Sequence, residues 1–221
     1  MIDCYILGSQ SNDRKELMEK AGLVPFIVLP SDYPEKDEAN EPTRLAEIHA
    51  TKKAQVVIDK FRLEMKKDKF RASLPIPKDL KTATFILITA DTIVSLKSEV
   101  IGKAEDEAEA ISILRRLAGQ THKLITAYRL AVLEVDMASL RVEEKKSTIN
   151  SSVTRVKFDP MDDDHIRAYV KTGEWKGRAG CYAIQLRASQ FVRSIDGSHS
   201  GVIGLPVSNI VTDLRTMGLD V

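Results

Sequence analysis

Short apolar runs alternate with longer segments of helical periodicity along this chain. Buried strands are predicted at 2–8, 26–29, 84–89 and 93–96, and again around 124–135 and 152–158. Apolar residues at helical spacing predict helices after residue 12, over 43–66, and in segments that follow Asp106, Asp163 and Pro206. Because strands and helices are interleaved, the pattern predicts an α/β or α+β class with a sizeable mixed sheet.

The ends of several helices are marked by their residue types. Gly22, Gly119 and Gly173 each follow a helix-like segment, where a glycine commonly ends a helix. Asp106 with Glu109 forms a start similar to a capping box, and we expect Asp163 to cap the helix that follows it. These signals divide the chain into elements without dividing it into domains.

Two charged segments interrupt this pattern. Residues 66–82 contain two prolines and are expected to be a surface insertion with no role in the core. Residues 136–148 are predicted to be a hairpin loop or a second insertion. The 221 residues suit one domain or two lobes of one domain, and the sequence contains no internal repeats.

Charge and composition argue against nucleic-acid-binding, membrane and secreted proteins. The formal net charge is +1, and no basic stripe with interleaved aromatic residues is present, so we expect no stable nucleic-acid partner. No apolar run approaches the length of a membrane span, and the N-terminus lacks the features of a signal peptide. We therefore expect a soluble cytoplasmic protein, with Cys4 and Cys181 reduced.

The first candidate site is the polar turn that follows the opening strand. Ser9, Ser11 and Arg14 offer hydroxyl groups and a guanidinium, and a helix N-terminus adds free backbone N–H groups. Together these groups suit phosphate oxygens. Taken alone, the turn is more simply explained as a helix cap by Ser11 or Asn12.

Further candidates follow along the chain. Asp91 ends a buried run, where it could bind Mg²⁺ or activate water, although a turn aspartate is the simpler interpretation. Lys53, on a helix, and Lys103, after a glycine, could bind phosphate; each alone would be a solvated lysine. Gln185 could contact a base or a water. The four histidines show no metal-binding spacing, and no serine lies in a nucleophile elbow.

The order of these motifs is more informative than any one of them, because in this order the chain resembles the Maf family of nucleotide pyrophosphatases. The matching segments are Leu7-Gly8-Ser9-Gln10-Ser11-Asn12-Asp13-Arg14, Pro30-Ser31-Asp32 with Glu35, Lys53-Ala54, Ala90-Asp91-Thr92, Gly102-Lys103-Ala104, Leu117 to His122, Tyr169 to Glu174, Ala179 to Gln185, and Ile203 to Pro206. They cover essentially the whole chain outside the two insertions.

The resemblance implies a two-lobed fold with a cleft along a long curved sheet, usually in a homodimer. It implies hydrolysis between the α- and β-phosphates of a nucleoside triphosphate with Mg²⁺ or Mn²⁺, and the motifs look like those of the branch that prefers dTTP and UTP. The catalytic residues implied for this chain are Asp91, Lys53 and Lys103, and the substrate-binding residues are Ser9, Arg14 and Gln185. Arg14, Lys53 and Lys103 are assigned to the phosphates. Glu35 and Asp91 are the implied metal ligands, and we prefer Asp91 as the base.

Three residues depart from the family pattern. Asp13 stands where the family usually has the first of two arginines, Leu186 replaces a glycine, and Gly201 stands where asparagine is common. An acid at position 13 would repel a triphosphate, so Asp13→Arg is expected to raise affinity. Two other hypotheses stay open: a nucleotide-binding regulator of little catalytic power, which Asp13 supports, and a pyrophosphatase of the ITP/XTP type, whose superfamily the fold also resembles.

Overall fold

A seven-stranded mixed sheet organises this computed structural model, which describes residues 2–35 and 39–221. The strands are β1 (Cys4–Leu7), β2 (Phe26–Val28), β3 (Thr82–Leu96), β4 (Glu99–Ile101), β5 (Thr121–Asp136), β6 (Val142–Phe158) and β7 (Val192–Asp196). Their order is β2-β1-β3-β5-β6-β7, with β4 paired to β3. β1 is parallel to β2 and β3, and the other pairs are antiparallel. The predicted mixed α/β class is confirmed.

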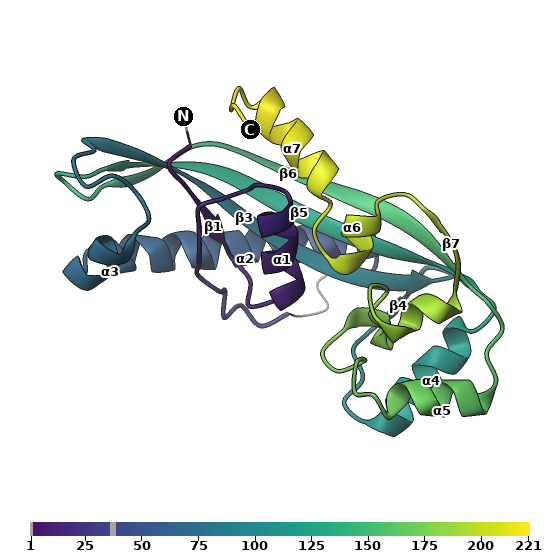
Figure 1. The fold of residues 1–221 in the computed structure, drawn as a ribbon. Helices are drawn as coiled ribbons and strands as arrows, with labels where there is room; N and C mark the ends of the chain where they lie inside the picture. Colours follow the sequence, from purple (N-terminus) through teal and green to yellow (C-terminus); the bar gives the residue numbers. More distant parts are fainter. Residues whose placement is uncertain (1, 36–38) are drawn as a thin grey trace.

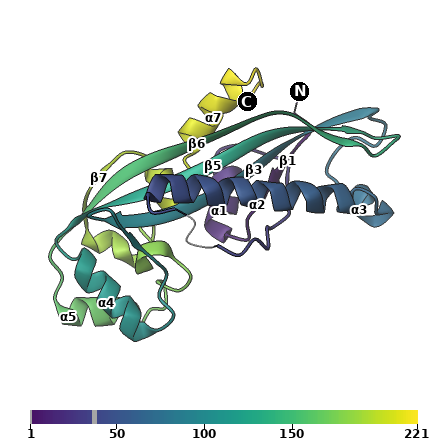
Figure 2. The same cartoon turned by 180° about the vertical axis from the view of Figure 1, so that it is seen from behind.

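Helices cover both faces of the sheet and build a lobe at one end of it. They are α1 (Asn12–Lys20), α2 (Pro42–Glu64), α3 (Asp68–Ser73), α4 (Glu107–Leu117), α5 (Asp163–Val170), α6 (His199–Ile203) and α7 (Val207–Thr216), with short 3-10 helices η1 (Ala179–Cys181) and η2 (Arg187–Phe191). In Figures 1 and 2, α2 follows one face, whereas α1, α6 and α7 lie on the opposite face. Within the described residues, no helix combines the length and the apolar character that crossing a membrane requires.

Alternation along the strands explains why two layers of helix can pack on one sheet. Successive side chains of a strand point to opposite faces. Ile6 accordingly packs with Phe61 of α2, whereas Leu7 packs with Met18 of α1 and Leu214 of α7. The central strands β1, β3 and β5 are thus buried between the helices, whereas much of β6 and β7 is exposed.

The buried face of α2 differs in part from the predicted one. The spacing of Leu45, Ile48, Val56 and Phe61 predicts that all four lie on that face, but only Leu45 and Phe61 are buried, and Ile48 and Val56 are half-buried. The fully buried positions include Ala46, Ala50 and Ala54. Their small side chains allow the helix to lie close to the sheet, which brings the longer side chains of neighbouring turns within reach of β3.

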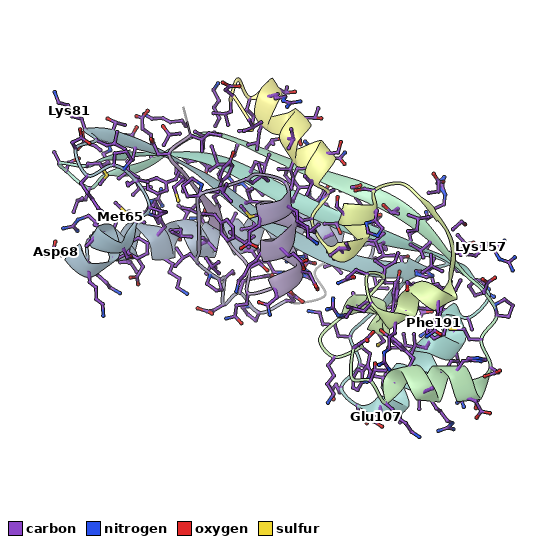
Figure 3. The ribbon with its side chains drawn as sticks, viewed as in Figure 1. Met65, Asp68, Lys81, Glu107, Lys157 and Phe191 are labelled. Atoms are coloured by element: carbon purple, nitrogen blue, oxygen red, sulfur yellow. The ribbon has the colours of Figure 1, made fainter. Side chains whose placement is uncertain are left out.

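The lobe at the end of the sheet has its own apolar core. Leu114 of α4, Tyr169 of α5 and Phe191 of η2 pack there with Phe158 at the end of β6. Figure 3 shows Phe191 and Glu107 in this lobe and Met65 and Lys81 at the opposite end of the molecule. The predicted two-lobed architecture therefore matches the arrangement of the described elements.

A gap in strand pairing lies where the two lobes meet. On one side, β3 pairs with β1 only as far as Ile88, and pairing with β4 begins at Val94. Within the part of the chain that the structure describes, residues 89–93 therefore have no strand neighbour on that side, while β5 pairs with them on the other. Asp91 and Thr92 lie at this gap, and the turn after β1 closes on it through a Gly8 N–H bond to the Ile88 carbonyl (2.9 Å). This break in the sheet places polar groups at a cleft.

Four expectations about local structure were wrong. The polar residues 90–92 do not separate two strands, because β5 pairs continuously with β3 across them. Most of 136–148 is not a loop, since β6 begins at Val142 after a tight turn in which the Asp136 carboxylate accepts from the backbone N–H of Ser139. Residues 197–206, whose glycines and serines predict a loop, contain α6, and Asp162, not Asp163, caps α5.

The segment 66–82 was also misjudged, since it contributes to the core. It holds α3, and the side chains of Leu74 and Ile76 are buried in the same cluster as Phe61 and Phe85. The prolines that suggested an exposed loop, Pro75 and Pro77, alternate with these two apolar residues. The segment covers the end of the sheet remote from the second lobe.

Leu74→Ala tests this core role. Leu74 is 3% exposed, so removing its side-chain methyl groups is expected to destabilise the fold by about 2–4 kcal/mol. Urea unfolding monitored by circular dichroism measures this change. Leu63→Ala, at a position 61% exposed, is the control and is expected to change stability by less than about 0.5 kcal/mol. Equal stability of the two variants would show that residues 66–82 are dispensable to the core.

Candidate functional site

A cavity of about 630 Å³ lies beside the gap in the sheet. The turn after β1, the start of α1, one residue of α2, the middle of β3 and the loop before η1 all contribute to its wall. Its polar lining includes Ser9, Ser11, Asp13, Arg14, Ser31, Tyr33, Glu35, Lys53, Asp91, Thr92, Lys103, Lys176 and Arg178. Segments distant in sequence therefore converge on one groove that contains both cations and carboxylates.

Two carboxylates and two lysines form a continuous chain of ion pairs across this cavity. Lys53 Nζ lies 2.5 Å from Asp91 Oδ1 and 2.7 Å from Glu35 Oε1. Lys103 Nζ lies 3.2 Å from Glu35 Oε2. The side chains of Lys53 and Asp91 are 12% and 8% exposed, so the inner pair is largely removed from solvent.

Both carboxylates are held in their ionised form. Burial alone would raise the pKa of Asp91, but a hydrogen bond from His49 and the charges of Lys53 and Arg14 outweigh it, so the pKa lies well below its usual value. Burial likewise opposes ionisation of Glu35, and Lys53 again outweighs it and lowers the pKa. At neutral pH, two negative charges therefore face the cavity.

Arg14 is anchored where α1 begins. Its Nε donates to the Gly204 carbonyl (2.7 Å), Nη1 to Ser9 Oγ (3.2 Å) and Nη2 to Thr92 Oγ1 (3.3 Å). Ser11 caps α1 by accepting from the Arg14 backbone N–H. Ser11 thus caps the helix, and the same turn still presents the Arg14 side chain to the cavity, where it could bind an anion.

Gly204 provides the close approach that Arg14 requires. Its φ of +126° is one that L side chains rarely adopt, and an added Cβ would lie 3.3 Å from Arg14 Nε. The helix end at residue 204 therefore supplies a carbonyl that fixes the guanidinium at the cavity.

The unusual acid at position 13 is not an isolated charge. Asp13 Oδ2 lies 2.5 Å from Arg178 Nη1, and Asp13 Oδ1 accepts a 2.9 Å hydrogen bond from Gln185 Nε2. Asp13 thus links α1 to two segments of the second lobe, the loop before η1 and the turn between η1 and η2. Its charge is balanced by a cation that sequence reasoning did not identify.

His49 is a second residue that sequence reasoning missed. Its Nδ1 lies 3.0 Å from Asp91 Oδ2, and the ring is buried. The spacing of the histidines predicts no metal site and so gives no role to His49. The one sequence signal for it is its position a single helical turn before Lys53. The two residues lie on the same face of α2 and reach the two oxygens of one carboxylate.

The donor set fits a divalent cation shared with a phosphate. No group of three or more metal-binding side chains occurs among residues 2–35 and 39–221. Mg²⁺, however, is commonly held by one or two carboxylates together with substrate phosphates and waters. Glu35 and Asp91 both contact the Lys53 ammonium, so their oxygens already converge on one positive charge.

Comparison with known proteins places the chain in a family. Residues 5–217 match the family described as Maf-like protein.

This chain belongs to the Maf family.

Curated relatives align over nearly their whole length. A dTTP/UTP pyrophosphatase of Geobacter sulfurreducens is 36% identical over 213 residues, covering 96% of each chain. One from Burkholderia thailandensis is 37% identical over 210 residues, covering 95% of this chain and 90% of the relative. One from Clostridium tetani is 32% identical over 216 residues and covers 98% of each. The family membership predicted from ordered motifs is confirmed.

The structure brings together most of the site residues predicted from the Maf motifs. Ser9, Arg14, Glu35, Lys53, Asp91 and Lys103 all line the cavity. Gln185 is not among the lining residues and reaches the cavity through Asp13. The convergence that the motifs require is therefore present, whereas the individual roles stay predictions.

Asp13→Asn is expected to strengthen substrate binding. An arginine at position 13 would face Arg178, so asparagine is the better substitution: it keeps an acceptor for Gln185 while removing the charge that occupies Arg178. In the variant, Arg178 no longer has to break its ion pair with Asp13 to meet a phosphate. A part-exposed ion pair contributes up to about 1 kcal/mol, so the KM for a nucleoside triphosphate is expected to fall roughly threefold. Steady-state kinetics with Asp159→Asn, at an exposed pair with Arg193, as control would measure it. An unchanged or higher KM would show that Arg178 does not meet the phosphates.

Proposed function

We propose that this Maf protein hydrolyses nucleoside triphosphates, with dTTP and UTP as preferred substrates, to a monophosphate and pyrophosphate. The observation that carries the proposal is the Glu35–Lys53–Asp91 chain beside Arg14 and Lys103 in one cavity. The relatives named dTTP/UTP pyrophosphatase support this activity and substrate choice.

The cations of the cavity suit a polyphosphate. A triphosphate brings nearly four negative charges, and fixed positive groups stabilise the charge that develops as the bond breaks. Arg14 offers a guanidinium whose position is set by Gly204 and Thr92, whereas Lys53 and Lys103 provide point charges on either side of Glu35. These side chains would bind and orient the three phosphates.

The carboxylates suit the activation of water. Mg²⁺ or Mn²⁺, held by Glu35 and Asp91, would neutralise phosphate charge and lower the pKa of a water beside it. Asp91 is the proposed acceptor of that water's proton because it lies on a strand paired to β5, whereas Glu35 lies on a loop. The low pKa of Asp91 makes it a weak base alone, so it would act on a water that is already acidified. The water oxygen would then bond to the α-phosphorus as the bond from that phosphorus to the bridging oxygen breaks, and pyrophosphate would leave with the bridging oxygen.

The remaining expectations stay predictions. A homodimer, a cytoplasmic location and the absence of a nucleic-acid partner follow from the resemblance or from composition. The regulator hypothesis rested on Asp13 as an unbalanced acid, and its pairing with Arg178 weakens that argument. The names of the relatives do not favour the ITP/XTP hypothesis.

A substrate panel tests the proposal. The purified protein is incubated with Mg²⁺ or Mn²⁺ and each common, inosine or xanthosine triphosphate, and pyrophosphate and orthophosphate are measured separately. We expect pyrophosphate, most rapidly from dTTP and UTP, and none when EDTA removes the metal. Tight binding without product would support the regulator hypothesis, and fastest turnover of ITP or XTP would support the third hypothesis.

A further inference from the structure

His49 occupies a position from which it can control the orientation of Asp91. It lies one helical turn before Lys53 on α2, and residues four apart on a helix share one face. Lys53 contacts Oδ1 of the Asp91 carboxylate, and His49 contacts Oδ2. One helix thus holds both oxygens of a carboxylate that belongs to β3.

The two contacts are not equivalent. Lys53 has a long, flexible side chain, and it also binds Glu35, so its ammonium can move between the two acids. The His49 ring is short and stiff, its side chain is 6% exposed, and the Tyr33 ring lies 6.0 Å away from it. His49 is therefore the contact that fixes the plane of the carboxylate.

In the contact between His49 and Asp91, the histidine is the hydrogen-bond donor. An ionised carboxylate can only accept hydrogen bonds, so His49 Nδ1 must carry the hydrogen in this contact. Both the neutral ring with its hydrogen on Nδ1 and the protonated ring carry this N–H, so the contact with Asp91 depends on the donor and not on the charge of the ring.

We propose that His49 is a positioning residue, whose Nδ1–H fixes Asp91 so that Oδ1 faces the metal and the attacked phosphate. The inference rests on the proposed function, because it assigns a partner to the carboxylate of that site. Groups that orient metal-binding carboxylates typically change metal affinity or activity by about 10- to 100-fold when they are replaced.

Three substitutions at position 49 and one control test the donor. His49→Leu fills the buried site with an apolar side chain and removes the donor, whereas His49→Asn places an amide N–H near the former Nδ1. His49→Gln carries its amide further out, near the former Nε2. His165, whose Nδ1 lies 2.8 Å from Asp162 Oδ1 on the surface, gives a matched histidine–aspartate pair for the control His165→Leu.

Two readouts separate positioning from general structural damage. For His49→Leu we expect kcat to fall about 10- to 100-fold with KM changed less than about threefold. The affinity of the nucleotide-free protein for Mn²⁺, measured by the electron paramagnetic resonance signal of free Mn²⁺, is expected to weaken by a similar factor. His49→Asn should recover most of both properties, and His49→Gln should not. The control should match the wild-type protein.

Several outcomes would overturn the inference. Wild-type kcat and Mn²⁺ affinity in His49→Leu would show that the contact is not needed. Should that variant not fold, equal impairment of the Asn and Gln variants would show that ring packing, not the donor, is what matters. If the wild-type protein released no pyrophosphate, the proposed function would fail, whereas the Mn²⁺ titrations would still test the role of His49.

Discussion

Asp91→Asn is expected to reduce pyrophosphate release by about 10³-fold or more, in line with losses measured when a proton acceptor or a fixed charge is removed from a reaction centre. Asparagine has the same shape as aspartate but no charge. It can neither take a proton from water nor contribute charge to a metal site. Its amide group would also face either the Lys53 ammonium or the His49 N–H, both of which are donors.

The fold is expected to survive this change. Asp91 lies in the middle of β3, where backbone pairing with β5 continues on both sides of it. Circular dichroism and the melting temperature check this point, and Asp59→Asn, at an exposed acid on α2 that pairs with Arg62, is the control for loss of a carboxylate. Turnover close to the wild-type rate in a folded Asp91→Asn protein would remove Asp91 from the mechanism.

Lys53→Met is expected to harm both activity and stability. The ammonium separates Glu35 from Asp91, so its loss leaves two carboxylates facing each other across the cavity. Removing one member of a largely buried ion pair costs about 3 kcal/mol, which for a chain of this length lowers the melting temperature by roughly 6–12 °C. Activity is expected to fall about 100-fold, because a phosphate cation disappears as well.

Divalent metal gives this second prediction a distinctive signature. Mn²⁺ can replace the missing positive charge between the acids, so it should raise the melting temperature of Lys53→Met more than that of the wild-type protein. Differential scanning fluorimetry with and without Mn²⁺ measures the difference, with Arg62→Met on the exposed side of α2 as the control. An equal response of both proteins to Mn²⁺ would contradict a metal site at Glu35 and Asp91.

Helix ends and buried strands were predictable because their signals are local. Gly22 follows α1 with a φ of +72°, and Asp106 accepts from the Glu109 N–H, as the residue types indicated. The region around Asp91 was harder to predict. The polar or small residues 90–92 suggested that the strand is interrupted there. Fourteen consecutive residue pairs with β5 instead continue β3 through them.

The site was predictable as a set of motifs but not as a network. Lys53 and Asp91 were both singled out, and the structure joins them. His49 and Arg178 were missed because their partners lie 42 and 165 residues away, and only the folded chain brings them together. The buried role of residues 66–82 was hidden for a similar reason, since the core that receives Leu74 is built by α2 and β3.

The most direct test of this account is a crystal structure of the wild-type protein with Mn²⁺ and a dTTP analogue whose oxygen between the α- and β-phosphates is replaced by a methylene group, so that it cannot be hydrolysed. The account predicts phosphates within hydrogen-bond distance of Arg14, Lys53 and Lys103, and an anomalous Mn²⁺ peak between Glu35 and Asp91. A nucleotide bound with its phosphates away from these side chains would contradict it.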